Sequence, residues 1–578
     1  MNGTVRALLL GLCLLSFGCD GSAPPEAAAP TDASAESRTE QDRPANVILI
    51  TMDTTRADAL GTYGQKLPTS PNIDRLAERG VLFEQAAASN PETLPSHSTI
   101  FTGKWPYMHG VRSNAGYVLS ERNLTLAEVL KERGYATGAE VAAPVLRRET
   151  QVTQGFDHYR GAESPGVELK VIRFTKGETP EVTRMIRLGS DITARGIDFL
   201  REHRDEPFFL WLHYFDAHNP NAAPPRFNEL IPTSPYHAEV AGADFQIGLL
   251  LRELAQLGLR DRTLVVLTAD HGEGLMEHGE PSHSFFVYET TMRVPLVFAG
   301  LPELPQGLRI PSLVRTADVA PTILDLLQLP PLDGVQGVSL VPLIKGLKKD
   351  LELTSYGEAT RFTATFGLPA IRYLREGRWK YIHKVNPELY DVIADPGELT
   401  NLADREPERV EKMRARLEAL LAAAPAPADD AQAALDSETA MQLMALGYVA
   451  SSRPFTIDDE KASLVLQGED PLSKVADIQI VSKADGLLRR GEHALALELV
   501  ETLYERNRDS TFVMDVFAQA LVGVGRYDEG IPLMRTILER EPDNQQVAYN
   551  LAEALRKAGR PEEAPPVLSA LLERSACD

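Results

Sequence analysis

Three apolar runs of strand length, each leading into an aspartate, constrain this sequence more than any other feature. They are Val47–Met52 before Asp53, Phe208–Phe215 before Asp216, and Leu264–Ala269 before Asp270. Continuous apolar runs are typical of strands buried on both faces, as in parallel sheets covered by helices. Ligands of such sheets bind beyond the carboxyl ends of the strands. One aspartate after a strand is more often a loop or cap residue, but three would converge at one edge and repel each other unless a cation joined them.

Helical patterns separate these strands as far as about residue 345. The segment Leu124–Arg133 ends at Gly134, and Tyr236–Leu257 ends at Gly258, as expected for helix termini. Strands that alternate with helices predict an α/β fold with a mostly parallel sheet and helices on both of its faces.

A second pattern begins near residue 355. Its shorter strand-like pieces are Ala370–Tyr373, Trp379–His383 and Glu388–Val392. We expect a small C-terminal sheet that completes the same catalytic unit. A low-complexity break, 422–430, follows.

The C-terminal part contains a repeat. Gly491, Gly525 and Gly559 are 34 residues apart, and each is followed five residues later by a small residue: Ala496, Gly530 or Ala564. This helix–turn–helix period resembles the tetratricopeptide repeat and predicts an all-α solenoid. We expect it to bind a protein segment or a second copy of the chain, although it could equally only cap the catalytic domain.

The N-terminus reads as an export signal. Arg6 precedes an apolar run, Ala7–Phe17, that is too short to span a bilayer, and Gly18-Cys19 resembles a lipoprotein cleavage site. We therefore expect an exported, periplasmic or cell-envelope protein, anchored to the membrane through lipid on Cys19; a plain cleaved signal is the alternative. The predicted organisation is a signal segment at 1–19, a flexible tether at 20–44, a catalytic domain at 45–420, a linker with short helices at 421–475 and repeats at 476–578.

The net charge of -23 argues against nucleic acid as a partner, because phosphate backbones bind basic surfaces. An anionic substrate would need a local cation. His271 directly follows Asp270, and His283 lies 12 residues further on, so a loop could return it to the same place. Mixed oxygen and nitrogen donors suit Zn or Mn better than Ca or Mg.

The segment Thr93–Gly103 (TLPSHSTIFTG) contains a candidate nucleophile. Pro95 suits the first turn of a helix, which would put Thr93 just before the helix N-terminus. There its hydroxyl would face the positive end of the helix dipole, and an adjacent metal would favour its alkoxide. The alternative is that Thr93 only caps the helix.

Nine motifs occur in order between residues 46 and 401. They are Asn46–Asp58, Ser70–Leu76, Thr93–Gly103, Tyr107–Val111, Phe215–Pro220, Asp270–Glu273, Arg293–Leu296, Ala317–Leu324 and Glu388–Asn401. Through them the chain resembles the sulfatase family of the alkaline-phosphatase superfamily. The resemblance implies that Asp53, Asp270 and His271 bind a metal. It also implies that Thr93 is the nucleophile and touches the metal, and that His218 faces the substrate.

Four departures from the family change the expected chemistry. Sulfatases carry a Cys or Ser that is oxidised to formylglycine, whereas the secondary alcohol of Thr93 would give a ketone, so we expect no formylglycine. His97 replaces an arginine, Thr54 replaces a second aspartate, and Gly138–Ala143 lacks the usual sulfate-binding Lys and His. Threonine nucleophiles are typical of phosphorus-handling relatives.

The resulting prediction is a metal-dependent hydrolase that cleaves a phosphate or phosphonate ester through Thr93. His218 or His97 would act as the hydrogen-bond or proton donor. Asp216, His218 and His283 could form a second metal site. The alternatives are a sulfuric ester hydrolase, a phosphoglycerol or phosphoethanolamine transferase, and a degenerate binding protein.

Overall fold

The computed structural model describes residues 45–173, 183–218, 223–424, 464–465, 468–542 and 544–575. The predicted signal, tether and lipidation at Cys19 lie outside these residues, as does most of the predicted linker. Among the helices described, none combines the length and apolar character needed to cross a bilayer.

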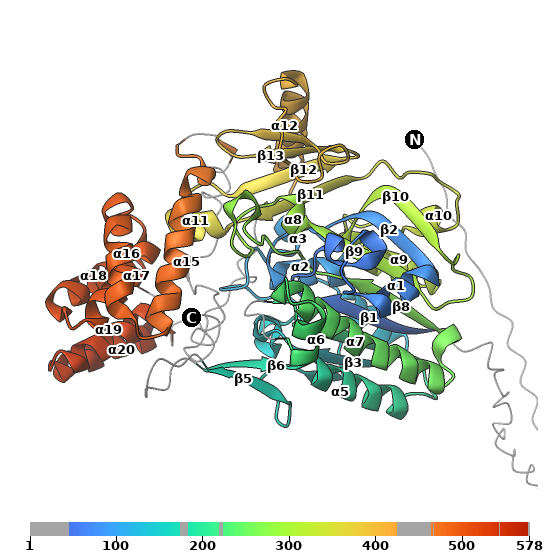
Figure 1. Cartoon of the computed structure of the whole chain (residues 1–578), viewed down its shortest axis with the longest axis horizontal. Helices are drawn as coiled ribbons and strands as arrows, with labels where there is room; N and C mark the ends of the chain where they lie inside the picture. Colours follow the sequence, from blue (N-terminus) through green and yellow to red (C-terminus); the bar gives the residue numbers. More distant parts are fainter. Residues whose placement is uncertain are drawn as a thin grey trace, which may run out of the picture. The chain divides into compact units, whose positions relative to one another are not determined.

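An eight-stranded sheet forms the centre of the fold (Figure 1). Its strands, in spatial order, are β10 (Leu308–Arg315), β2 (Gly80–Ala87), β9 (Arg293–Ala299), β8 (Thr263–Thr268), β1 (Asn46–Met52), β7 (Phe208–Tyr214), β3 (Ala136–Val141) and β4 (His158–Arg160). Only β9 runs antiparallel to its neighbours, which confirms the predicted mostly parallel sheet.

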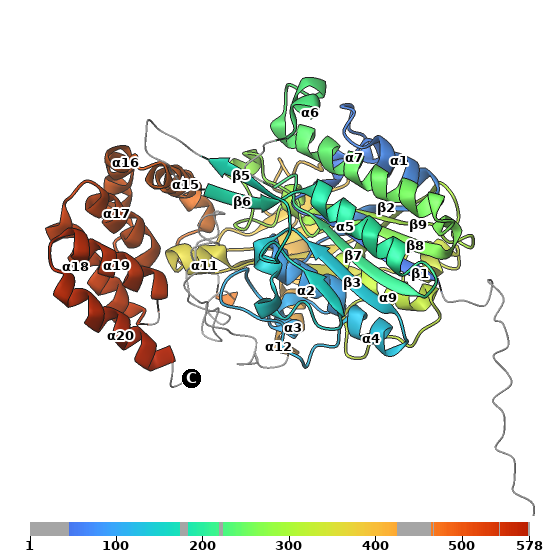
Figure 2. The ribbon, with the colours of Figure 1, turned by 90° about the horizontal axis from the view of Figure 1, so that it is seen from below.

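Helices cover both faces of this sheet (Figure 2). One face carries α1 (Pro71–Glu78), α5 (Gly189–Glu202) and α7 (Pro235–Gln256); the other carries α2 (Thr93–Thr102), α4 (Leu126–Glu132) and α9 (Val319–Leu326). The remaining short helices of this part are α3 (Pro106–His109), α6 (Pro225–Leu230), α8 (Glu289–Met292), α10 (Val341–Ile344) and α11 (Arg361–Phe366), and a two-stranded ribbon joins β5 (Leu169–Arg173) to β6 (Thr183–Arg187).

The three central strands are buried along their whole length, because helices exclude water from both sides. In β1, for example, Val47, Ile48, Leu49 and Ile50 are all fully buried. Since β8, β1 and β7 are adjacent and parallel, their carboxyl ends emerge at one edge, as predicted. The two predicted helices are α4 and α7, and the glycines that end them, Gly134 and Gly258, have the positive φ angles that this position requires.

The second sheet is antiparallel and contains β11 (Thr354–Ala359), β12 (Ile371–Glu376), β13 (Trp379–His383) and β14 (Glu388–Asp391), with α12 (Pro407–Ala422) packed against it. A buried ion-pair cluster ties it to α8. Glu289 accepts hydrogen bonds from Arg375 and Lys380, both at 2.9 Å. Burial would raise the pKa of Glu289, but Lys380 and Arg375 outweigh it and hold the pKa at about 2.

Six helices follow in pairs, which confirms the helical solenoid: α15 (Val475–Arg489), α16 (His493–Arg506), α17 (Thr511–Gly523), α18 (Tyr527–Arg540), α19 (Gln545–Lys557) and α20 (Ala564–Ser575). The three glycines of the 34-residue period all have positive φ at the turn inside each pair. A Cβ at Gly530 would lie 2.8 Å from the side chain of Val522, so a small residue is needed for the close helix contact.

The repeats contact the preceding part of the chain at the loop after Asp270 and at helix α11. Gln479 donates a hydrogen bond to the carbonyl of Gly279 at 3.0 Å, and Ser510 donates one to the carbonyl of Thr365 at 2.6 Å. Residues Pro44–Asp578 form one compact unit. The domain boundaries predicted near 420 and 475 therefore stay predictions.

We predict that Glu289→Gln lowers the free energy of unfolding by about 3 kcal/mol, because it leaves two buried cations without their shared carboxylate. Because the pKa of Glu289 is lowered by folding, this stability is present above about pH 4.5 and is lost as the pH falls towards 2. Denaturant unfolding measures the change. The matched control is Glu411→Gln, which breaks an exposed pair with Arg414 and should leave the free energy of unfolding almost unchanged. Equal effects of the two substitutions would contradict the assignment.

Candidate metal centre and active site

Two of the three predicted aspartates meet at the carboxyl edge of the sheet. Asp53 follows β1 and Asp270 follows β8, and both are fully buried. The main-chain N–H of Asp53 continues the β1–β7 ladder by donating to the carbonyl of Tyr214 at 2.8 Å. Asp270 accepts from the main-chain N–H groups of His271 at 2.8 Å and Thr54 at 3.3 Å. The strand ends therefore fix both carboxylates.

The turn after β1 is held in an uncommon backbone conformation. Thr54 has a φ of 52°, in the left-handed region that non-glycine residues seldom adopt. The hydroxyl of Tyr236, on α7, donates to the carbonyl of Thr54 at 2.8 Å and accepts from the main-chain N–H of Arg56 at 3.0 Å. These bonds hold the turn so that the N–H of Thr54 faces Asp270.

Asp53, Asp270 and His271 form a group whose potential ligand atoms all lie within 4.8 Å of one another. His271 donates from Nδ1 to the carbonyl of Gly272 at 2.9 Å, which leaves the lone pair of Nε2 for a metal. Among the described residues, no hydrogen-bond partner reaches Asp53 Oδ1, Asp270 Oδ2 or His271 Nε2. Buried polar atoms without partners are costly, so these residues fit a divalent cation.

The pKa values of the two carboxylates also favour a bound cation. Burial raises the pKa of Asp53 to about 6, although His271 and His283 oppose the rise. Burial and the neighbouring Asp53 also raise the pKa of Asp270. Two carboxylates that resist ionisation at the same place are the arrangement that a cation relieves.

Thr93 lies beside this group, as the first residue of α2. Its Oγ1 donates to Asp53 Oδ2 at 3.5 Å, at the long end of hydrogen bonding. The sequence predicted that Thr93 would stand one residue before the helix. Instead Glu92 occupies the cap position, so the alternative that Thr93 is the cap is wrong.

The loop after α3 explains why Thr93 does not cap the helix. Glu92 accepts from Ser113 Oγ at 2.8 Å and from the main-chain N–H of Asn114 at 2.6 Å. Asn114 in turn accepts from the main-chain N–H of Leu94 at 2.7 Å. An asparagine from outside the helix therefore satisfies the helix N-terminus and leaves the Thr93 hydroxyl to the carboxylate.

His97 is fully buried beneath the site, and both of its ring nitrogens are occupied. Nδ1 lies 2.8 Å from the carbonyl of Thr93 and therefore donates to it, while Nε2 lies 3.0 Å from Thr51 Oγ1. Trp211 donates to the same hydroxyl at 2.9 Å. Burial lowers the pKa of His97 to about 3 despite Asp270, so the ring is neutral. This chain of hydrogen bonds positions the start of α2.

Two other predicted histidines lie beside the group of Asp53, Asp270 and His271, which we call the metal group. The loop after Asp270 returns as predicted and brings the ring of His283 to 4.7 Å from that of His271 and 5.1 Å from that of His218. Burial would lower the pKa of His283, but Glu273, 3.3 Å away, and Asp53 raise it to about 9. His218 stacks on Phe215 at 4.2 Å.

The return of this loop depends on Gly272, where a Cβ would lie 2.1 Å from the carbonyl oxygen of Thr290. Arg56 fastens the other side of the loop through Glu277 at 2.6 Å and also pairs with Asp58. These contacts engage the guanidinium of Arg56 outside the metal group.

Asp216 is placed differently from Asp53 and Asp270. Its carboxylate faces the start of α5, where a Cβ at Gly189 would lie 2.4 Å from Oδ2. Within the described residues, the sets of three potential ligands within 4.8 Å are Asp53, Asp270 and His271, and His97, His213 and Asp270. Neither set includes the predicted second-site residues Asp216, His218 and His283, so a second metal there stays a prediction.

Sequence reasoning missed His213 and Glu273. His213 is fully buried in β7, and its Nε2 lies 3.3 Å from Asp53 Oδ2. Burial lowers its pKa to about 4 in spite of Asp270. A histidine inside an otherwise apolar strand that leads to the site was the available signal. Glu273 is buried in the DHGE motif and pairs with His283.

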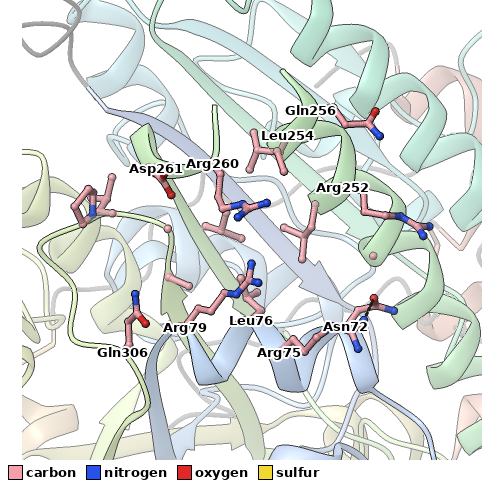
Figure 3. A pocket seen from close by; sticks show the side chains of 18 residues that line it. Asn72, Arg75, Leu76, Arg79, Arg252, Leu254, Gln256, Arg260, Asp261 and Gln306 are labelled. Carbon is pink, nitrogen blue, oxygen red and sulfur yellow. Dashed lines mark hydrogen bonds between the residues drawn. The ribbon is translucent and has the colours of Figure 1, made fainter. Parts of the chain in front are cut away.

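A large hollow elsewhere on the molecule is unrelated to these residues. It has a volume of about 1030 Å³ and is lined by residues of α1, of α7 and of the segment after β9. Figure 3 shows the side chains that line it. Its rim carries Arg75, Arg79, Arg252 and Arg260, and leucines form part of its lining. Arg260 precedes β8, so the hollow lies towards the amino end of that strand, away from Asp270.

Comparisons with known proteins agree with the geometry. The family model described as "Sulfatase" matches residues 45–329, that of "N-sulphoglucosamine sulphohydrolase, C-terminal" matches 277–424, and that of "Tetratricopeptide repeat" matches 516–576. The carboxyl edge of the sheet, with Asp53, Thr93 and Asp270, therefore falls inside the first match.

Individual relatives carry mostly sulfatase names. The chain is 26% identical to an ulvan-active sulfatase of Formosa agariphila, covering 63% of this chain and 78% of that one. It is 24% identical to an N-acetylgalactosamine-6-O-sulfatase of Bacteroides thetaiotaomicron, covering 65% and 93%. Among solved structures, the phosphonate monoester hydrolase of Agrobacterium radiobacter superposes with a TM-score of 0.54 at 22% identity, covering 65% and 95%, which shows a shared fold.

We predict that Asp53→Asn stabilises the metal-free protein near pH 7.5, because asparagine keeps the shape and removes a buried charge. Since folding raises the pKa of Asp53 from 3.8 to about 6, the folded state binds this proton more tightly than the unfolded state. Stability is therefore lost as the pH rises through 6, by roughly 3 kcal/mol.

Thermal unfolding of chelated protein measures this effect, with the exposed Asp404→Asn as the control. With metal added, the wild-type protein should be more stable than Asp53→Asn, because it binds the cation more tightly and gains more stability from it. If Asp53→Asn destabilised the protein equally with and without metal, Asp53 would have only a structural role.

Proposed function

Because this chain carries a sulfatase-family domain over residues 45–329 and a tetratricopeptide repeat over 516–576, we propose that it is a metal-dependent hydrolase of phosphate or phosphonate esters with Thr93 as its nucleophile. The observation that carries the proposal is the position of Thr93, whose hydroxyl points at Asp53 within the buried carboxylate and histidine group. The substrate is an anionic ester.

Asp53, Asp270 and His271 would hold the metal, and the hydroxyl of Thr93 would complete the site. A divalent cation held there would neutralise charge on the transferring group and lower the pKa of the Thr93 hydroxyl. We favour Zn or Mn, because the donors are two carboxylates and an imidazole.

The residues of the chain then have distinct tasks. Thr93 Oγ1 bonds to phosphorus in line with the departing ester oxygen, and its proton leaves by way of the carboxylate of Asp53. His218 or His283 supplies a proton to the leaving oxygen, and the protonated form of His283 beside Glu273 suits this role. Water then displaces Thr93 from phosphorus and restores the hydroxyl.

His97 is assigned a positioning role in this proposal. Its two ring nitrogens bond to Thr51 and to the carbonyl of Thr93, so it orients the residue that carries the nucleophile. Of the two donors considered from the sequence, His218 is therefore preferred, because its ring lies next to that of His283 beside the metal group.

Phosphorus is preferred to sulfur for a chemical reason. A threonine cannot yield the aldehyde on which formylglycine sulfatases depend, since its hydroxyl sits on a secondary carbon. The sulfatase names of the relatives favour a sulfuric ester hydrolase as the second candidate. Transfer of a phosphoglycerol or phosphoethanolamine group would use the same first step and an alcohol in place of water.

A degenerate binding protein is the remaining alternative. The buried Asp53, Asp270 and His271, with ligand atoms that lack partners, argue against it because such a group is costly without a cation. Less than about half an equivalent of metal in the purified protein would favour the binding protein.

The cellular location and the domain organisation of the enzyme are part of the same proposal. We place the protein in the periplasm or cell envelope, exported by residues 1–19 and anchored through lipid on Cys19. A catalytic domain at 45–420 and a linker at 421–475 precede the repeats. Residues 476–578 would bind a protein partner or a second copy of the chain.

We predict that Thr93→Ala lowers kcat/KM by at least about a thousandfold while metal content stays close to that of the wild-type protein. Thr93→Ser keeps a hydroxyl and should retain measurable turnover. Both variants are compared by steady-state kinetics and by elemental analysis. Most of the activity surviving in Thr93→Ala would exclude the proposed nucleophile.

The choice between phosphorus and sulfur requires a substrate panel. Aryl sulfate, phosphate monoester, phosphodiester and phosphonate monoester are assayed with and without chelator. We expect turnover of a phosphorus ester, loss of that turnover on chelation and recovery on adding Zn²⁺ or Mn²⁺. Intact-mass analysis should find an unmodified threonine at 93. Cleavage of the sulfate ester alone would make the second candidate the function.

A further inference from the structure

One histidine beside the carboxylates has no role in the proposal above. His213 lies on β7, where it pairs in register with Thr51 of β1, two residues before Asp53. Its side chain is fully buried. With His97 and Asp270, it belongs to a set of potential ligand atoms that lie within 4.8 Å of one another. It therefore borders the same group of carboxylates from the strand opposite β8.

The contacts of its ring are unusual for a buried histidine. Nε2 of His213 lies 3.3 Å from Asp53 Oδ2, yet neither ring nitrogen has a hydrogen-bond partner among the described residues. A proton on Nε2 with good geometry would have made that contact a hydrogen bond. A lone pair that faces a carboxylate oxygen at this distance is repulsive, and a cation between the two atoms removes the repulsion.

Its neighbour His97 differs in the hydrogen bonding of its ring nitrogens. Both nitrogens of His97 are occupied, by Thr51 and by the carbonyl of Thr93, so a metal would have to displace one of these bonds. Among the described residues, His213 has no hydrogen bond to another residue that a metal would have to displace. Of the two histidines in this set, His213 is the one available to a cation.

We propose that His213 is a further protein ligand of the metal, beside Asp53, Asp270, His271 and Thr93, and that the ends of β7, β1 and β8 therefore each contribute to the site. The proposal rests on the metal centre of the proposed function and extends it. Two carboxylates and two imidazoles favour Zn, Mn or Co over Ca and Mg, which prefer oxygen alone. The second imidazole thus strengthens the preference for these metals over Ca and Mg.

The test compares metal binding by the full-length wild-type protein, His213→Ala and a control, His109→Asn. His109 is also a buried histidine, but its two nitrogens bond to Thr99 and to the main-chain N–H of Val111. After chelation, each protein is titrated with Zn²⁺ in competition with an indicator dye. We expect His213→Ala to weaken Zn²⁺ binding by at least about tenfold and His109→Asn to leave it unchanged. Selectivity for Zn²⁺ over Ca²⁺ should fall in His213→Ala only.

A second readout needs no variant. Zinc-edge X-ray absorption of the wild-type protein counts coordinated imidazoles, and we expect two. One imidazole, or equal Zn²⁺ affinity of the wild-type protein and His213→Ala, would overturn the role of His213 and leave the metal-dependent hydrolase standing. A wild-type protein that binds no divalent metal would overturn both. If His213→Ala does not fold, the imidazole count decides.

Discussion

The burial of Asp53 and Asp270 side by side is the constraint on which the rest of the site depends. Both carboxylates are fully buried at the ends of adjacent parallel strands, and burial raises the pKa of each. Two like charges in such a place are unfavourable unless a cation joins them. Several nearby groups face these carboxylates: main-chain N–H groups satisfy one oxygen of Asp270, and ring nitrogens of His271 and His213 lie close to Asp270 and Asp53.

Around this group, hydrogen bonds and close packing hold the start of α2 and the loop that carries His283 in place. The chain from Trp211 through Thr51 and His97 ends on the carbonyl of Thr93 and fixes the start of α2. The loop that carries His283 is held by Gly272 against Thr290, and Gln479 of the repeats donates to the carbonyl of Gly279 in the same loop. The helical repeats are therefore in direct contact with the loop that carries His283.

Much of this was predictable from the sequence. The strands β1, β7 and β8 were recognisable because parallel sheets require uninterrupted apolar runs, and the 34-residue period marked the helix pairs through their glycines. The grouping of Asp53, Asp270 and His271 followed from strand ends that share an edge. Thr93 could be identified as a candidate but not placed, since its position in α2 depends on Glu92 and on Asn114, a residue 21 positions beyond it that a turn brings back.

The sequence by itself thus determined the fold class, the repeat and the chemical types available at the site, because apolar periodicity and the identity of side chains are local properties. Only the tertiary structure decided which of those side chains meet. It turned Asp216 towards α5 although it ends a strand in the same way as Asp53, and it brought His213 out of an apolar run to within 3.3 Å of a carboxylate. The physical reason is that proximity across strands depends on register and on packing between distant segments, and neither is written in the spacing of residues along one strand.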